Sequence, residues 1–98
     1  MEEQLEFRER QSKLMLKQLV VSRKLIERAI ERMKADREVV EKVELKDEKN
    51  DTKRNALKAK LAEMDAILES EKLKLEMVDF NRENVEKQLE QLVKMRGS

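Results

Sequence analysis

The sequence contains no cysteine, proline, histidine, tryptophan or tyrosine, and its only glycine is Gly97. Without histidine and cysteine the chain lacks the usual zinc ligands, and it can build neither a Ser-His-Asp triad nor a cysteine nucleophile. Without further glycines it has no loop of the kind that cradles a phosphate. We therefore expect that the protein is not an enzyme, and we expect no catalytic, cofactor-binding or metal-binding residues.

Turn-forming residues and long apolar runs are also scarce. Residues that favour turns gather only at Asn50-Asp51-Thr52, and no apolar run is longer than Leu19-Val20-Val21. A helix that crosses a bilayer needs about 20 such residues, and the N-terminus also lacks the apolar core of a signal peptide. We expect no membrane partner and an intracellular, cytoplasmic location. We interpret Gly97-Ser98 as a cloning remnant and exclude it from the fold.

Charged residues are abundant, at 46% of the chain with a net charge of +1. Disorder is the main alternative for such a composition, because a highly charged chain can fail to bury enough apolar surface. However, 39% of the residues are hydrophobic, and they recur in a seven-residue pattern without a slip in register. Such a repeat places apolar side chains on one face of a helix, where a second helix covers them. The pattern predicts an all-α coiled coil.

The heptad is set with position a at Leu5 and position d at Arg8. Its apolar a and d positions, apart from the small residue Ala29, form the predicted core. They are Leu5, Met15, Leu19, Ile26, Met33, Val40, Val43, Leu57, Leu61, Met64, Leu68, Leu75, Val78, Val85, Leu89 and Leu92.

The apolar pattern at positions a and d is interrupted where three consecutive core positions are occupied by Asp47, Asn50 and Arg54. Asn50, Asp51 and Thr52 are also good helix N-caps. We therefore predict a single domain over 1–96, with helix one at about 3–46, a polar turn at about 47–53 and helix two at about 53–96. This is a helical hairpin, with possible pairing into a four-helix bundle. A continuous helix that dimerises is the alternative.

Charge favours an antiparallel arrangement. Residues 8–24 are predominantly basic and residues 76–92 predominantly acidic, so a hairpin sets opposite charges side by side. One register pairs Val40 with Met64 and Leu19 with Val85. A register shifted by one heptad is also mostly apolar, so the sequence leaves both open.

Further apolar residues flank the core, such as Leu16 and Ile30 at position e and Leu25 and Met95 at position g. They either shield the core edges or form part of a larger bundle. Other apolar residues lie outside the core and make a candidate partner face. They are Phe7, Leu14, Val21, Leu73 and Phe80.

These features indicate a structural protein–protein interaction module that oligomerises or spaces a larger assembly. Its partners would be copies of itself or partner helices, with no small-molecule substrate. The alternative is a regulated binding module whose outer helical face binds a globular partner such as a small GTPase. Nucleic-acid binding through the basic segment 8–24 is a weaker alternative, because aromatic residues are almost absent and the net charge is only +1.

Overall fold

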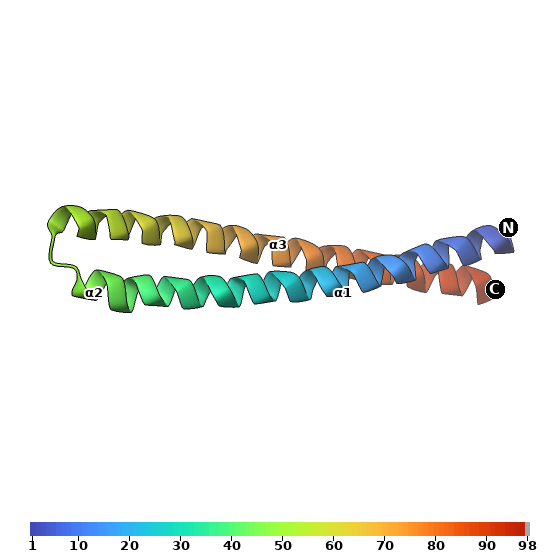
Figure 1. The fold of residues 1–98 in the computed structure, drawn as a ribbon. Coiled ribbons are helices and arrows are strands. Elements are labelled where there is room, and N and C mark those ends of the chain that lie inside the picture. The colour runs from blue at the N-terminus through green and yellow to red at the C-terminus, as the bar shows by residue number, and fades with distance from the viewer. Residues whose placement is uncertain (98) are drawn as a thin grey trace. The chain divides into compact units, whose positions relative to one another are not determined.

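The fold is all-α, as the heptad pattern predicts. The computed structural model describes residues 1–97, so Ser98 of the expected cloning remnant lies outside the described residues. The chain forms α1 (Glu2–Val39), the short π-helix η1 (Val40–Glu44), α2 (Leu45–Asp47) and α3 (Asp51–Gly97) (Figure 1). The predicted hairpin is confirmed, because α3 runs back along the first helix instead of continuing it.

The chain divides into two compact units, which we call the turn unit and the terminal unit. The turn unit comprises residues 26–74 and contains the connection between the two helices. The terminal unit comprises residues 1–25 together with residues 75–97. In each unit a segment of α1 lies antiparallel to a segment of α3.

The turn is made by three residues, Glu48, Lys49 and Asn50. Glu48 adopts an extended conformation, with φ −81° and ψ 124°, which ends α2. The side chain of Asn50 then caps α3, because its Oδ1 accepts a hydrogen bond of 3.1 Å from the backbone N–H of Lys53. None of the described residues other than glycine has a positive φ, so this turn requires no glycine.

Arg54 supports the turn from the other side. Its Nη1 atom donates hydrogen bonds to the backbone carbonyls of Leu45 and Glu48, at 2.8 and 2.9 Å. The last carbonyls of a helix have no partner within the helix, so a cation that binds them stabilises its C-terminal end. The polar residue at a predicted core position therefore has a structural role in the hairpin.

The first helix contains one π-helical turn just before the hairpin connection. In η1 the backbone N–H of Leu45 bonds to the carbonyl of Val40, five residues earlier. A π-turn accommodates one extra residue and rotates the positions that follow it. Val40 is buried and Leu45 is half-buried, whereas Val43 between them is exposed.

The core face of α3 follows the predicted heptad. Leu61, Leu68 and Val85 are buried. The remaining predicted core residues of this helix are half-buried, namely Leu57, Met64, Leu75, Val78, Leu89 and Leu92. Burying a Val or Leu side chain fully stabilises a fold by about 1.5–3 kcal/mol, and a two-helix seam realises only part of this for each residue.

On α1, one of the two heptad positions that face the core differs from the prediction. The a residues Leu5, Leu19, Ile26 and Met33 are half-buried and Val40 is buried, as expected. Met15 and Val43, predicted as core at position d, are instead 51% and 53% exposed.

Position e is more buried than position d along this seam, where only Ser22 and Ala29 of position d are half-buried. The residues of position e that are buried or half-buried are Glu9, Leu16, Arg23, Ile30 and Arg37. A seam along a and e repeats every 3.5 residues just as one along a and d does, so the helix meets its partner with a slightly rotated face.

The register of the two helices, which the sequence leaves open, is marked in the turn unit by one ion pair. The buried apolar residues of this unit are Val40, Ile30, Leu61 and Leu68, at 4%, 8%, 9% and 9% exposure, and Arg37 pairs with Asp65. The ion pair between Arg37 and Asp65 shows which residues of the two helices lie side by side in this unit.

Candidate interaction surfaces

A buried carboxylate lies in the seam of the terminal unit. Glu9 is only 8% exposed, and its Oε2 accepts a hydrogen bond of 2.6 Å from Nη1 of Arg96. Its Oε1 lies 3.1 Å from Nζ of Lys13, one turn along α1. A buried carboxylate needs such partners, because an unpaired charge in a dry environment is costly. Glu9 therefore fixes the end of α3 against the start of α1.

A second ion pair joins the helices of the terminal unit. Nε of Arg23 donates a hydrogen bond of 2.9 Å to Oδ1 of Asp79. Both residues belong to the oppositely charged segments that favoured the antiparallel arrangement. Because both side chains are partly solvated, this pair selects orientation more than it adds stability.

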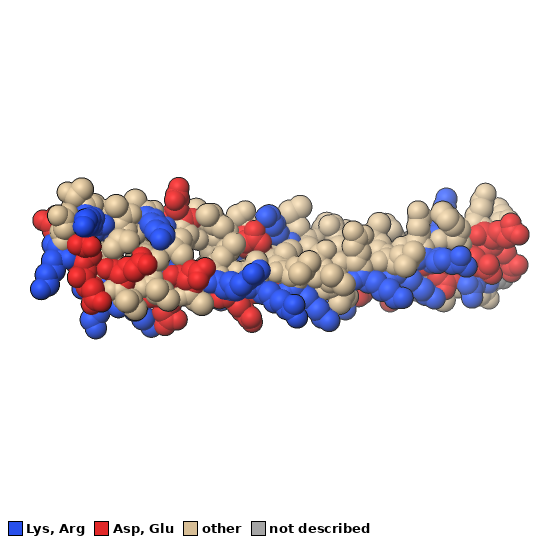
Figure 2. Space-filling view, viewed as in Figure 1, with Lys and Arg blue, Asp and Glu red and all other residues tan. Residues whose placement is uncertain are grey.

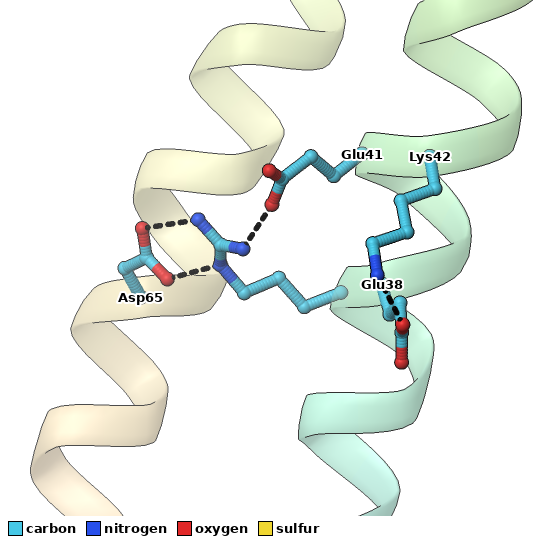
Figure 3. A network of polar contacts seen from close by, with 5 residues as sticks. Glu38, Glu41, Lys42 and Asp65 are labelled. Atoms are coloured by element: carbon cyan, nitrogen blue, oxygen red, sulfur yellow. Dashed lines mark hydrogen bonds and ion pairs between the residues drawn. The ribbon is translucent and has the colours of Figure 1, made fainter.

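The turn unit contains a network centred on Arg37 (Figure 3). Its guanidinium group points across to Asp65 on α3 and binds both carboxylate oxygens, with 3.2 Å between Nη2 and Oδ2. Nη1 donates a further hydrogen bond to Glu41. A planar guanidinium that binds a carboxylate with two parallel hydrogen bonds also fixes the relative position of the two helices.

These contacts shift the titration of their members. The hydrogen bond from Arg37 lowers the pKa of Asp65 below its ordinary value, and the hydrogen bonds to Asp65 and Glu41 raise the pKa of Arg37. One turn away, the hydrogen bond from Lys42 lowers the pKa of Glu38, and the same bond raises the pKa of Lys42. All four groups therefore keep their charges more firmly than isolated side chains do.

A row of exposed apolar side chains runs along the outer side of α1 in the terminal unit. Phe7, Leu14 and Val21 are 63%, 59% and 56% exposed. They recur every seven residues, so they lie on one side of the helix. We call these three residues the outer ridge.

The other two predicted partner residues lie on α3. Leu73, in the turn unit, and Phe80, in the terminal unit, are both exposed. Met77 is also exposed and was missed by the sequence analysis. Its spacing of three residues from Phe80 is the signal that would have identified it.

The side of the terminal unit next to the outer ridge is almost free of charge. On α1, positions spaced alternately by four and three residues are Gln4, Arg8, Gln11, Met15, Gln18, Ser22 and Leu25. On α3, the same spacing gives Met77, Asn81, Asn84, Gln88, Gln91 and Met95. We call these sets the α1 and α3 amide stripes. Every glutamine of the chain belongs to them.

The two amide stripes meet at a groove of about 400 Å³. Its lining comes from Arg8, Gln11 and Ser12 of α1 and from Gln88, Gln91, Leu92 and Met95 of α3. Since each stripe keeps to one side of its helix, the remaining members extend the same face along the terminal unit. The sequence analysis missed this face, although the seven-residue spacing of Gln4, Gln11 and Gln18 signals it.

The surface view is consistent with an uneven distribution of charge. In the half of Figure 2 that holds the two termini in Figure 1, uncharged side chains form a broad band, and Lys and Arg side chains gather beneath it. In a chain with 46% charged residues, uncharged side chains concentrated in this way mark a surface distinct from its surroundings.

Comparison of the chain with family models, with curated proteins and with solved structures finds no match. Within residues 1–97, no helix is both long and apolar enough to cross a membrane. The same residues contain no group of three or more carboxylates placed to hold a metal ion.

Proposed function

We propose that this chain is a protein–protein interaction module without catalytic activity, which oligomerises or spaces a larger assembly inside the cell. The hairpin supplies a long scaffold of two helices, and its outer surfaces supply the binding sites. The outer ridge is the observation that carries this proposal.

The proposal of an interaction module is supported by how little apolar surface the two helices bury between them. Two paired helices bury one seam, and even the most deeply buried apolar side chain, Val40, keeps 4% of its surface exposed. Large apolar residues such as Phe7 and Leu14 remain more than half exposed. Isolated exposed apolar residues are common in proteins, but a row of them along one helix suits a partner that buries them together.

The geometry of the outer ridge indicates the kind of partner. Side chains spaced by seven residues are the anchors with which a helix binds an apolar groove or another helix. Basic residues such as Arg10 and Lys17 lie on the same helix, so the rim of the partner's groove is expected to carry acidic residues.

The test is capture of partners by the immobilised chain, compared among three forms. These are the original protein, the double variant Leu14→Lys/Val21→Lys, and the control Ala62→Lys/Ala66→Lys. All four positions are exposed, so each variant should retain its helical circular dichroism and differ only in surface chemistry.

We expect the original chain and the control to capture the same partner and the Leu14→Lys/Val21→Lys variant to lose it. The partner is then identified and purified, and direct binding is measured with the same three forms. Equal direct binding by all three forms would remove the outer ridge from the proposal.

A further inference from the structure

We infer that the amide stripes form a second coiled-coil seam, through which the terminal unit pairs with the terminal unit of a second copy of this chain. The inference rests on the proposed function, because it names one partner of the interaction module. It concerns other side chains than those of the outer ridge, although the α1 amide stripe lies beside that ridge, where Phe7, Gln4 and Gln11 line one hollow.

The spacing of the stripes is that of a helix–helix seam. Alternating steps of four and three residues give the 3.5-residue repeat with which one helix follows another. The seam within the chain has the same repeat, but it uses other positions of α1 and α3. The terminal unit thus carries two such repeats on each helix, and the hairpin itself occupies one.

The side chains of the stripes suit burial against another protein. Arg8 is the only charged residue among them, although the chain as a whole is 46% charged. Met15, Leu25, Met77 and Met95 are 51–64% exposed and supply apolar surface. Methionine is flexible and adapts to irregular gaps, which suits a surface that packs against its own copy.

The amides point to a second copy as the occupant. Each Gln or Asn side chain both donates and accepts hydrogen bonds, so a face of amides is complementary to an identical face. None of the seven amides in the stripes makes a side-chain hydrogen bond within residues 1–97. Arg8 is the single charge on this face, so the face offers little to select an oppositely charged partner, and in a two-fold pair the uncharged amides meet their own copies without repulsion.

The stripes end where the turn unit begins. The next positions in the same spacing are Ala29, Arg32 and Asp36 on α1, and Lys74 on α3, so charges replace the uncharged side chains from Arg32 onward and at Lys74. Charges of this kind oppose burial, so they limit the contact to the terminal unit. Pairing of two helix pairs over this length produces a local four-helix bundle.

The available area fits a reversible dimer. The α1 amide stripe from Gln4 to Leu25 is about 30 Å long at a rise of 1.5 Å per residue, and two adjacent helices are about 20 Å wide. This gives about 600 Å² per copy, slightly below the roughly 800 Å² of a standard interface. Polar residues in such a seam fix its register at a cost in stability. We therefore expect dimerisation in the micromolar range.

The test is sedimentation equilibrium of the complete chain, whose monomer mass is 11.7 kDa. The key variants are Gln18→Lys/Gln88→Lys and Gln18→Glu/Gln88→Glu, which place like charges on the proposed seam. The matched control is Ala59→Lys/Ala66→Lys, which adds the same positive charge at exposed positions of α3 in the turn unit. Far-ultraviolet circular dichroism checks that every form is folded.

We expect the original chain and the control to dimerise with the same dissociation constant. Each seam variant alone should dimerise at least about tenfold more weakly, because facing like charges cost more than the ~1.4 kcal/mol that a factor of ten represents. Mixing the Lys and Glu variants should restore the dimer, since opposite charges then face each other. A general loss of folding would not produce this rescue.

Two results would overturn the inference. One is a chain that remains monomeric at several hundred micromolar. The other is a dimer that the Gln18→Lys/Gln88→Lys change leaves intact. If that dimer is lost in Leu14→Lys/Val21→Lys, the outer ridge is the self-contact. A monomer that still binds another protein through the outer ridge would leave the proposed function standing.

Discussion

The guanidinium group of Arg54, in the first turn of α3, donates a hydrogen bond of 2.8 Å to the backbone carbonyl of Leu45, in α2. A cation near the start of a helix is unfavourable for that helix, because the N-terminal end already carries partial positive charge. Here it acts on the end of the preceding helix instead. Arg54 thus ties together the two helix ends that the turn joins.

Replacement of Arg54 by alanine should lower the free energy of unfolding by about 1–2 kcal/mol, because the carbonyls of Leu45 and Glu48 lose a charged donor. Urea denaturation followed by circular dichroism measures the change. Lys53→Ala removes the same charge from an exposed neighbour, and it should change stability by less than about 0.5 kcal/mol. Equal losses in the two variants would show that charge alone matters at the turn.

The observed burial predicts that substitutions of two leucines of α3 differ sharply in their effect on stability. Leu68 is buried in the seam, whereas Leu73 is 53% exposed. Leu68→Asp should destabilise the hairpin by several kcal/mol or unfold it, because it buries a carboxylate that has no partner in the seam. The expected loss is similar to that of breaking a buried ion pair, ~3–5 kcal/mol. Leu73→Asp should keep a cooperative melting curve near that of the original chain. An unchanged melting curve for Leu68→Asp would contradict the assigned core face.

The pairing of Arg37 with Asp65 predicts a dependence on pH. The pKa of Asp65 is lower in the folded chain than its ordinary value, so folding favours the ionised carboxylate. The stabilising contribution is therefore fully present above the unfolded pKa of about 3.9, and it is lost as pH falls through the lower folded pKa. Asp65→Asn should be less stable than the original chain at neutral pH, and the difference should vanish in strong acid.

Because Asp65 is solvated, this contribution should be small and sensitive to salt. Thermal melts of the original chain and Asp65→Asn at low and high ionic strength measure it. Glu69→Gln is the matched control, since Glu69 is an exposed acid of α3. If the two variants respond alike to pH and salt, general charge and not the contact with Arg37 explains the effect.

The hairpin and its turn could be predicted from the sequence because their signals are local. The polar interruption and the capping ability of Asn50 identified the turn, and the long apolar repeat identified two helices. The lack of glycine was no obstacle, since the extended conformation of Glu48 reverses the chain with ordinary backbone angles.

The face of α1 that packs against α3 could not be predicted exactly, because heptad positions d and e of this helix contain similar mixtures of apolar and charged residues. Position d contains Arg8 and Asp36 beside Met15, and position e contains Glu9 and Arg37 beside Leu16. A count of apolar residues therefore does not show which of the two positions is buried. Specific ion pairs across the helices decide between them, and a pattern within one helix does not contain that information.

The amide stripes escaped prediction for a related reason. The search for binding faces looked for apolar side chains, whereas these stripes are distinguished by a lack of charge. Only the groove between Gln11 and Gln88 showed that the stripes of two distant segments belong to one surface.

The π-helical turn at Val40–Glu44 has a consequence for variation in chain length. If one residue of this segment were deleted, the turn could become ordinary α-helix, and Leu45 would follow Val40 by four positions instead of five. Val40, Leu45 and Glu48 would then continue the seam without interruption. A single-codon deletion here should therefore be tolerated, whereas the same deletion elsewhere in α1 would rotate every later side chain by about 100°. The segment is a place where this protein could gain or lose a residue during evolution without rebuilding its core.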